Sequence, residues 1–390
     1  MSHKYAQSFG TALFSFKFAT IPWYMRIGII LHPSDENTPT GLGRFIFELA
    51  KEFISRDTKN QYIIYLKRKP RTPLDLPGSN WKVEYGSGGL LWLDEVLRKG
   101  EKADVYLFNT PMMPLWYRPK NAVIIALDFA YWHLRPKTIQ EALMRIGLFW
   151  YHRRSLHRAD HVVATSHSTR GELVELFGVS PSSITVIYPG YKSICTLPEE
   201  ECTVPEKFFF YVGSIKERKN VLNMVKGFTA FKEQTHNDFK FLIAGPGSGP
   251  YYESIISYLQ EHHRAQDVIF LGYVSDGNIA FLYKHAYALI FTTLIEGAIG
   301  MPVLEAMECG LPVITSRTPT AMEVRAGDAA LLADPESPQE IGQAMEQIVS
   351  DQKLHQELIQ KGFLFVKQFE WGALISKYHD VFATLKKSSD

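Results

Sequence analysis

Residues 208–231 read FFFYVGSIKERKNVLNMVKGFTAF, and this stretch decides the fold class. An apolar run ends at Gly213, a polar loop follows, and apolar residues then recur at helical spacing. A strand, a glycine loop and a helix in this order form the opening of a β-α-β unit. The same order begins at residue 25, where MRIGIILHP precedes the polar loop SDENTPTGLGR and the helical pattern RFIFELAKEF. The chain therefore contains two similar α/β halves.

Further strand candidates follow each opening: QYIIYLK, ADVYLFN, AVIIALD and HVVATS in the first half, and FKFLIAGPGSG, DVIFLGYVS, YALIFTTL and LPVITS in the second. Strands that alternate with helices predict parallel, doubly wound sheets. We predict an α/β protein with two Rossmann-like domains that face each other across a cleft, where ligands bind outside the carboxyl ends of the strands. The predicted parts are an extension (1–24), an N-terminal domain (25–190), a linker (191–206), a C-terminal domain (207–370) and a final helix that returns toward the N-terminal domain (371–390).

Composition narrows the class of protein. A chain of 390 residues with 46% hydrophobic and 21% charged residues is typical of a globular protein of two domains. The net charge of +1 argues against a nucleic-acid partner held by bulk charge, so any bound anion needs a local site. The odd number of cysteines, Cys195, Cys202 and Cys309, argues against a disulfide framework and indicates a reduced, cytoplasmic setting. No stretch approaches the roughly 20 apolar residues that span a bilayer.

Two segments raise the question of a peripheral contact with the inner face of the membrane. Residues 1–24 mix aromatic and basic residues, but Lys17 interrupts the apolar run and no small-residue cleavage site follows. We expect a loosely ordered extension there, with a membrane-surface contact as the alternative. Residues 143–158, LMRIGLFWYHRRSLHR, can lie on an anionic membrane or form an amphipathic helix packed on the sheet with its basic face in solvent. The pattern favours the packed helix.

A second informative stretch is EGAIGMPVLEAMECG, residues 296–310. Gly300 and Pro302 bracket Met301, and proline at the first helical position is preorganised for a helix start. Free backbone amides at such a start form a ready site for an anion.

Carboxylates lie on both sides of that helix start. Glu296 precedes the turn and Glu305 lies one turn into the helix, so we expect them on different faces. Because carboxylates repel phosphate, they make sense as acceptors for neutral hydroxyls on either side of it. A ligand with phosphates in the middle and hydroxyls at both ends is a nucleoside-diphosphate sugar. Ordinary surface glutamates are the alternative interpretation.

The loop GSIKERKN, residues 213–220, supplies cations. Arg218 and Lys219 follow the first strand of the second half, and a helix begins directly after them. Their charges and the helix dipole can meet a diphosphate. A solvated basic turn is the alternative interpretation.

Together these pieces resemble a known family. GLGRFIFELAKEF, ADHVVATSHSTRGELVELFGVSPSSITVIYPG, FFFYVGSIKERKNV, FLIAGPGSG, VIFLGYVSD, EGAIGMPVLEAMECGLPVITS and EVRAGDAALLADP are similar to segments of the retaining glycosyltransferases of family 4, which have the GT-B fold. They run in family order over about residues 25–375. The resemblance implies a hexosyltransferase that moves a sugar from a nucleotide-diphosphate sugar to a glycan or lipid-linked saccharide in cell-surface polysaccharide synthesis. GDP-mannose is a plausible donor and UDP-sugars nearly as plausible. The N-terminal domain would bind the acceptor and the C-terminal domain the nucleotide-sugar.

The resemblance also implies roles for residues. Glu296 would contact the transferred sugar, Glu305 the ribose hydroxyls and Lys219 the diphosphate. Glu296, Lys219 and Arg218 are thus the candidate catalytic residues. The candidate donor-binding residues, which include the two glycines of an N-terminal glycine loop, are Gly41, Gly43, Gly213, Ser214, Gly297, Gly300, Met301, Pro302 and Glu305.

Three features depart from the family pattern. Eight residues, GAIGMPVL, separate the paired glutamates where the family usually has seven, and Ser214 stands where many members have arginine. Arg218 is the candidate substitute for that arginine. Leu127 precedes Asp128 where members often have histidine, so either His133 takes over the histidine's role or that role is absent. Asp128 and His133 are the candidate acceptor-side residues. The alternative function is a non-catalytic or weakly active protein that binds nucleotide-sugars.

We expect no metal ion and no cofactor. The chain has no Asp-x-Asp sequence, and His157 and His161 are four apart at a point where a strand pattern begins. Protein cations and helix termini would then neutralise the departing diphosphate. A Rossmann oxidoreductase is disfavoured, because GPGSG at residues 245–249 lacks the G-x-G-x-x-G spacing.

Overall fold

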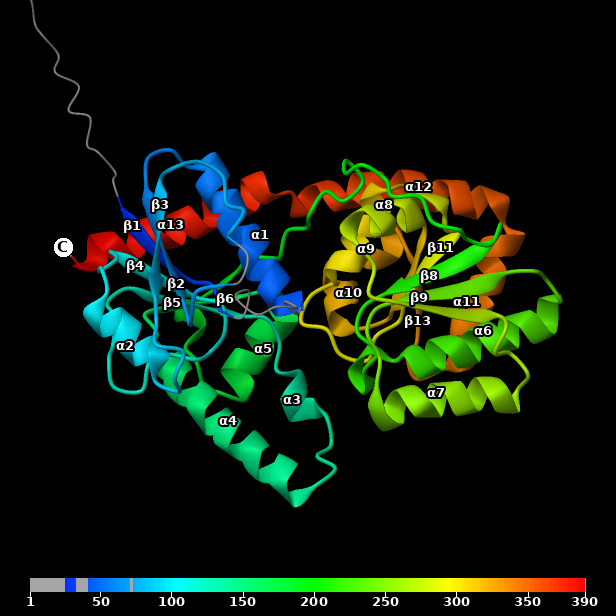
Figure 1. Ribbon diagram of the computed structural model, residues 1–390, viewed down its shortest axis with the longest axis horizontal. Coiled ribbons are helices and arrows are strands. Elements are labelled where there is room, and N and C mark those ends of the chain that lie inside the picture. Colours follow the sequence, from blue (N-terminus) through cyan, green and yellow to red (C-terminus); the bar gives the residue numbers. More distant parts are fainter. Residues whose placement is uncertain (1–24, 33–40, 71–72, 390) are drawn as a thin grey trace, which may run out of the picture.

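The computed structural model describes residues 25–32, 41–70 and 73–389, and it shows two α/β lobes side by side (Figure 1). The predicted extension, residues 1–24, and most of the polar loop after the first strand lie outside the described residues.

The first lobe is built on a sheet of seven parallel strands in the order β3-β2-β1-β4-β5-β6-β7 among the described residues. The strands are β1 (Arg26–Ile30), β2 (Gln61–Leu66), β3 (Trp81–Tyr85), β4 (Val105–Phe108), β5 (Ala122–Ala126), β6 (His161–Ala164) and β7 (Ile184–Val186). The helices are α1 (Gly41–Arg56), α2 (Trp92–Lys99), α3 (Ala130–His133), α4 (Ile139–Arg158), α5 (His167–Glu175) and the 3-10 turn η1 (Pro181–Ser183).

The second lobe repeats the plan with six parallel strands in the order β10-β9-β8-β11-β12-β13. The strands are β8 (Phe208–Val212), β9 (Lys240–Ala244), β10 (Val268–Gly272), β11 (Ala288–Phe291), β12 (Val313–Ser316) and β13 (Leu331–Ala333). The helices and 3-10 turns are η2 (Glu217–Lys219), α6 (Val221–Thr235), α7 (Gly249–Glu261), α8 (Asp276–His285), α9 (Met301–Glu308), α10 (Pro319–Glu323), η3 (Ala326–Asp328), α11 (Pro338–Ser350), α12 (Gln352–Val366) and η4 (Lys367–Phe369).

Most of the strands read as continuous apolar runs because helices cover both faces of each sheet, whereas the edge strand β3, WKVEY, is only partly buried. Strands β4, β5 and β11 are buried along their whole length. In each lobe the first strand, β1 or β8, lies between the second and the fourth, so the strand order reverses there and a crevice opens at the carboxyl ends. These features confirm the predicted α/β fold with two Rossmann-like units.

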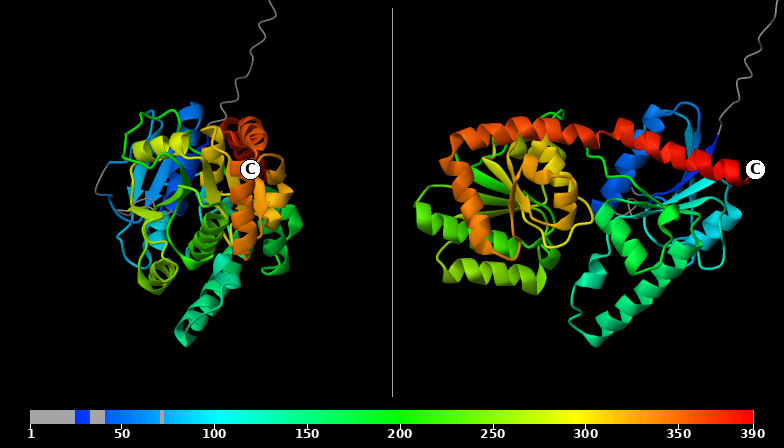
Figure 2. Two further views of the ribbon diagram at one scale, coloured as in Figure 1. Left: turned by 90° about the vertical axis from the view of Figure 1, so that its right-hand side faces the viewer. Right: turned by 180° about the vertical axis from the view of Figure 1, so that it is seen from behind.

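The end of the chain belongs to the first lobe. Helix α13 (Trp371–Ser389) runs back across it at the top of Figure 1, and the view from behind in Figure 2 agrees. Trp371, Tyr378 and Phe382 are buried in the core of the first sheet. A Cβ atom on Gly190 would lie 2.4 Å from the Trp371 ring, so the chain passes this helix too closely for a side chain. The last helix thus completes the first lobe.

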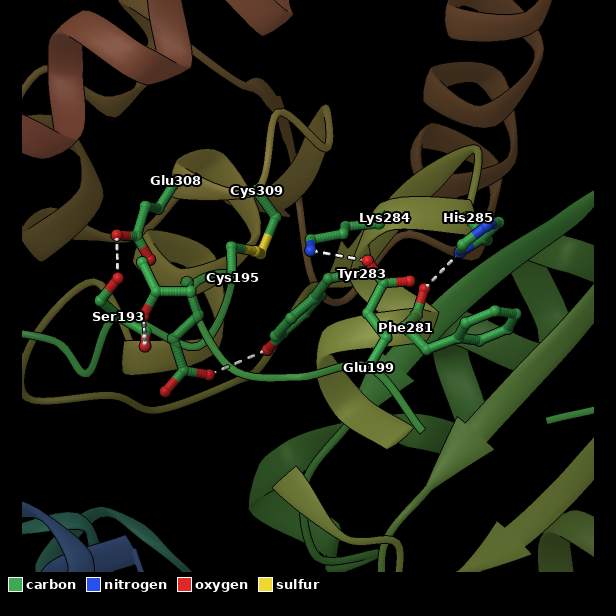
Figure 3. The surroundings of a disulfide bond; sticks show 11 residues. Ser193, Cys195, Glu199, Phe281, Tyr283, Lys284, His285, Glu308 and Cys309 are labelled. Atoms are coloured by element: carbon green, nitrogen blue, oxygen red, sulfur yellow. Dashed lines mark hydrogen bonds and ion pairs between the residues drawn. A yellow bond between two sulfur atoms is a disulfide. The ribbon is translucent and has the colours of Figure 1, made fainter. Parts of the chain in front are cut away.

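The odd number of cysteines argued against a disulfide framework, but two of the three cysteines form a disulfide bond. Cys195, in the linker, is bonded to Cys309 at the end of α9, with the two Cα atoms 5.5 Å apart (Figure 3). The Ser193 hydroxyl donates a 2.6 Å hydrogen bond to Glu308, which holds the linker along this helix. Cys202 keeps a free thiol. The number of cysteines alone does not show whether two of them are bonded. A chain with three cysteines can form one disulfide bond, and the fold decides which two come close enough.

Helix α4 also differs from its prediction. It packs on the first lobe through His152, Ser155 and Leu156, but large apolar side chains such as Leu143 and Trp150 are exposed. The helix is therefore packed on the lobe as expected, but apolar side chains share its solvent-facing surface with the basic ones. None of the described helices combines the length and the apolar character needed to cross a membrane.

Candidate active site

The basic loop after β8 is fastened to the loop after β11. Asn220 adopts a left-handed conformation with φ of 61°, and its side-chain amide donates to the carbonyls of Thr292 (2.8 Å) and Pro335 (2.6 Å). The Leu294 amide donates to the carbonyl of Arg218 (3.0 Å). Sequence reasoning missed Asn220, although asparagine directly before a helix is a residue that tolerates left-handed geometry. The fastening brings the charged side chains of the two loops together.

Those side chains form a compact charge cluster. The Lys219 ammonium contacts the Glu296 carboxylate, and one Arg218 guanidinium nitrogen lies 3.8 Å from the same oxygen. The side chains of Lys219 and Glu296 are only 14% and 16% exposed. The Lys219 nitrogen also lies 5.4 Å from the centre of the Phe291 ring. Two cations share one carboxylate, so the cluster carries positive charge that a bound anion can neutralise.

Helix α9 begins beside this cluster. Gly300 precedes the helix with φ of 92°, and a Cβ atom there would lie 2.7 Å from the Phe291 ring, so glycine is required for two reasons. Met301 is the first helical residue and Pro302 the second, one position later than predicted. Ile299, within the segment that carries the extra residue, is buried in the core of the second lobe.

Glu305 lies on the inner side of α9. Its carboxylate accepts a 3.0 Å hydrogen bond from the Tyr283 hydroxyl. Burial raises the pKa of Glu305 to about 7, although this hydrogen bond and the charge of Arg44 oppose the shift. Arg44, from α1 of the first lobe, binds Asp276 at the start of α8 with a distance of 2.5 Å. The second glutamate is thus placed where the two lobes meet.

The remaining donor-binding candidates lie at strand and helix ends. Gly41 and Gly43 are in the first turn of α1, not in the loop that the sequence predicted, because the helix begins at Gly41. Gly213 and Ser214 follow β8, where the Gly213 amide donates to Ala244 (2.9 Å) and the Ser214 carbonyl accepts from a tyrosine hydroxyl (3.2 Å).

A pocket of about 180 Å³ lies between the lobes. The second lobe contributes Glu296 and Gly297. The first contributes Asp128 after β5, His133 at the end of α3 and Glu172 from α5. The two acceptor-side candidates thus share one pocket with a candidate catalytic residue.

His133 has a partner that sequence reasoning missed. Its Nε2 atom contacts the Glu172 carboxylate, and burial raises the pKa of Glu172 although His133 lowers it. Helix α5 was visible in the sequence, but no signal in it singled out Glu172.

At Gly297 the backbones of the two lobes lie in close contact. A Cβ atom on Gly297 would lie 1.7 Å from the Leu127 carbonyl oxygen. The Thr165 hydroxyl donates to the Leu127 carbonyl at 2.8 Å. The Thr169 hydroxyl lies within hydrogen-bond distance of both carbonyls, 3.2 Å from that of Leu127 and 3.3 Å from that of Gly297. Only glycine allows this backbone contact.

Hydrogen bonds and ion pairs also join the lobes. The Glu323 carboxylate of α10 accepts from the amides of His167 and Ser168 at the start of α5, both at 2.8 Å. Lys192 of the linker lies 2.8 Å from Asp276 of the second lobe and 3.8 Å from Glu48 of the first. The lobes are therefore held together around the candidate site.

Residues 25–32, 41–70 and 73–389 contain no cluster of three or more His, Cys, Asp or Glu side chains that suits a metal ion. His157 contacts the Phe177 carbonyl (2.8 Å), whereas His161 contacts the Thr185 hydroxyl (2.9 Å). The two histidines therefore do not share a ligand site.

Comparison with known families decides the class of protein. The family model described as "Glycosyltransferase Family 4" matches residues 39–192, and the model described as "Glycosyl transferases group 1" matches residues 198–365. The two matches follow each other along the chain, one on each lobe. The chain belongs to the group 1 glycosyltransferases of family 4.

Relatives of this glycosyltransferase include "O-antigen chain mannosyltransferase B" of Escherichia coli, 28% identical over 280 residues, which are 68% of this chain and 71% of that protein. "O-antigen chain mannosyltransferase RfbU" of Salmonella typhimurium is 27% identical over 217 residues, 56% of this chain and 58% of that protein. The chain thus spans less than two thirds of the length of RfbU.

Solved structures agree on the fold. Sucrose-phosphate synthase from Thermosynechococcus elongatus aligns with a TM-score of 0.72 and 18% identity over 93% of this chain and 99% of that one. HepE of Anabaena, solved with UDP-glucose, aligns with a TM-score of 0.71 and 16% identity over 92% of this chain and 100% of that one. These neighbours confirm the GT-B fold of the glycosyltransferase.

Proposed function

We propose that this glycosyltransferase transfers a hexose, with mannose as the first candidate, from a nucleotide-diphosphate sugar to a glycan or lipid-linked saccharide during cell-surface polysaccharide synthesis, with retention at the anomeric carbon. The single observation that carries the proposal is the pocket that Glu296 shares with the His133–Glu172 pair. Lys219 and Arg218 reach this pocket through their ion pairs with Glu296. The names of the two O-antigen mannosyltransferases support mannose and the polysaccharide. The UDP-glucose complex of HepE supports a nucleotide-sugar donor.

The charge cluster suits a diphosphate. Because Lys219 and Arg218 outnumber the carboxylate of Glu296, a donor diphosphate can bind both cations. Glu296 is then free to accept hydrogen bonds from the transferred sugar. The amides at the start of α9 add positive potential next to it. Glu305, held by Tyr283, is placed to accept from the ribose.

These groups stabilise negative charge on the leaving diphosphate without a metal ion. Negative charge builds on the diphosphate as its bond to the sugar breaks, and fixed cations in a site that excludes water stabilise it strongly. We therefore propose that the transfer needs no divalent cation and no other cofactor.

The first lobe would hold the acceptor. Asp128, His133 and Glu172 offer acceptors and a donor for hydrogen bonds to sugar hydroxyls. We place the reaction on the cytoplasmic side of the membrane, where a lipid-linked acceptor is within reach of a peripheral enzyme.

A donor screen followed by a turnover assay tests the proposal. We expect GDP-mannose or a UDP-sugar to raise the melting temperature, because a ligand of the folded state stabilises it by mass action. The matching donor should then support transfer to a saccharide acceptor, with the donor's anomeric configuration in the product by NMR and an unchanged rate in EDTA. Binding without turnover on any acceptor tried would favour the nucleotide-sugar-binding alternative. No shift with any nucleotide-sugar would contradict both.

A further inference from the structure

Helix α4 carries an exposed apolar stripe. Ile139, Leu143, Ile146 and Trp150 are 82%, 65%, 51% and 61% exposed. Their spacing of four, three and four residues places them on one face of the helix. The buried residues His152, Ser155 and Leu156 lie on another face, toward the lobe. We call these four exposed residues the α4 stripe.

The segment around the stripe is strongly basic. Residues 135–158 contain six basic side chains and one acidic one, whereas the whole chain has a net charge of +1. The guanidinium groups of Arg154 and Arg158 bind carbonyl oxygens of residues 114–117, and neither forms an ion pair with a carboxylate of the described residues. The charge of Asp94 acts on Arg158 from a greater distance and offsets part of this positive charge. Burial, and then the charges of Arg154 and Arg118, lower the pKa of Arg158, as expected where cations cluster. Lys137, by contrast, pairs with Glu217.

The shape of this region is convex. Helix α4 extends below the rest of the first lobe in Figure 1 and stands out equally in both views of Figure 2. At its C-terminal end the carbonyl of Leu115 binds Arg154, and the neighbouring Trp116 is 71% exposed. A protruding surface with exposed apolar and tryptophan side chains beside arginines matches the boundary of a bilayer, where apolar groups enter the acyl region and cations meet the headgroups.

We propose that the α4 stripe, with Trp116, Arg154 and Arg158, docks this protein onto a bilayer that contains anionic lipids. Charge complementarity selects this occupant, because the segment carries an excess of basic residues and its arginines beside the stripe have no ion-pair partner among the described residues, so they attract anionic headgroups. The docked surface adjoins the pocket between the lobes: His133 lies at the pocket, and Thr138 caps the start of α4 five residues later. That the docked protein reaches a lipid-linked acceptor through this pocket rests on the proposed function. The docking itself does not.

Vesicle flotation with the full chain tests the docking. We expect the wild type to float with vesicles of phosphatidylcholine and phosphatidylglycerol, to float less with phosphatidylcholine alone, and to detach as salt rises. The variant L143Q/W150Q should lose at least about tenfold in partitioning, because two large apolar side chains no longer enter the bilayer.

The chain offers a matched control. Leu364 and Met322 of the second lobe are 69% and 56% exposed, close to the values for Trp150 and Leu143, so L364Q/M322Q should bind like the wild type. Arg154→Gln should weaken binding to anionic vesicles about fivefold, whereas Arg154→Lys should not.

Two results would overturn the docking: a wild-type chain that does not float, or an L143Q/W150Q variant that floats like the wild type. A stripe variant that changes only the monomer–dimer equilibrium, measured by sedimentation, would assign the surface to a second copy and also overturn it. The thermal shift with nucleotide-sugars separates this test from the proposed function. L143Q/W150Q should keep the wild-type shift, and a chain that floats but binds no donor would contradict only the proposed function.

Discussion

The two lobes share a sheet topology and differ in what their loops present. In both, the first strand lies between the second and the fourth, β1 between β2 and β4 and β8 between β9 and β11. In the second lobe the loops after β8 and β11 present Lys219 and Glu296, a cation paired with a carboxylate. In the first lobe the segment after β5 leads to His133, which pairs with Glu172 of α5. One backbone plan thus carries two chemistries, because side chains at the carboxyl ends of strands vary without changing the sheet.

Removal of the Lys219 cation in the second lobe should have the largest effect on the reaction rate. We expect Lys219→Ala to lower kcat by about 10²–10³, roughly 3–4 kcal/mol, as for the loss of one preorganised donor to a developing charge. Lys216→Ala is the matched control, because Lys216 is exposed in the same loop, and it should retain the wild-type rate. Steady-state kinetics with the matching donor measures both variants. Wild-type turnover in Lys219→Ala would remove Lys219 from the catalytic set.

Separation of the lobes should have the next largest effect. In Gly297→Ala the new methyl group would overlap the Leu127 carbonyl, so the loop or the lobes must move. A displacement of about 1 Å at a reacting centre can lower the rate by about 100-fold, and we expect a loss of about 10–100-fold.

Gly171→Ala provides the comparison for this variant, because a Cβ atom on Gly171 would meet nothing within 4 Å. It should retain activity and gain up to about 1 kcal/mol in stability. Small-angle scattering should show a more open molecule for Gly297→Ala alone. An unchanged rate and shape in Gly297→Ala would mean that the close contact between the lobes is dispensable.

The smallest expected effect is on stability and concerns Glu305 of the second lobe. Its pKa of about 7 lies above the ordinary value of 4.5, so its contribution to stability is complete below pH 4.5 and is lost as the pH rises to about 7. The free energy of unfolding of Glu305→Gln should therefore fall less between pH 5 and pH 8 than that of the wild type, by on the order of 2 kcal/mol.

Urea denaturation at several pH values measures this difference, with Glu253→Gln on the exposed side of α7 as the control. Parallel pH profiles for Glu305→Gln and the wild type would show that Glu305 does not titrate in this range.

Most of the fold could be predicted from local features of the sequence. Apolar runs predicted the parallel strands because a strand buried on both faces needs apolar residues along its whole length. Gly300 and Pro302 predicted the start of α9 to within one residue because their backbone preferences act locally. The return of α13 to the first lobe is visible only in the packing of residues such as Trp371.

In the candidate site, too, some residues were predicted from the sequence and others were missed. Glu296, Lys219 and Arg218 were identified from residue type and position after a strand, and the structure places them together. Glu172 and the Cys195–Cys309 bond were missed, because each depends on a partner far away in the chain: 39 residues for Glu172 and 114 for the cysteines. The catalytic roles of Glu296, Lys219 and Arg218 stay predictions until the variants are measured.

The sequence by itself determined two α/β units, most of their strands and the charged loops at the strand ends, since backbone preference, apolar periodicity and residue type act over a few residues. It missed β3 and β13, whose sequences WKVEY and LLA are only partly buried. The tertiary structure alone decided which charges meet: His133 with Glu172, Arg44 with Asp276, and Gly297 against Leu127. It also decided that the α4 stripe faces outward, because burial depends on what the rest of the chain leaves uncovered. Contacts between distant segments are set by how whole elements pack, and no local pattern encodes that.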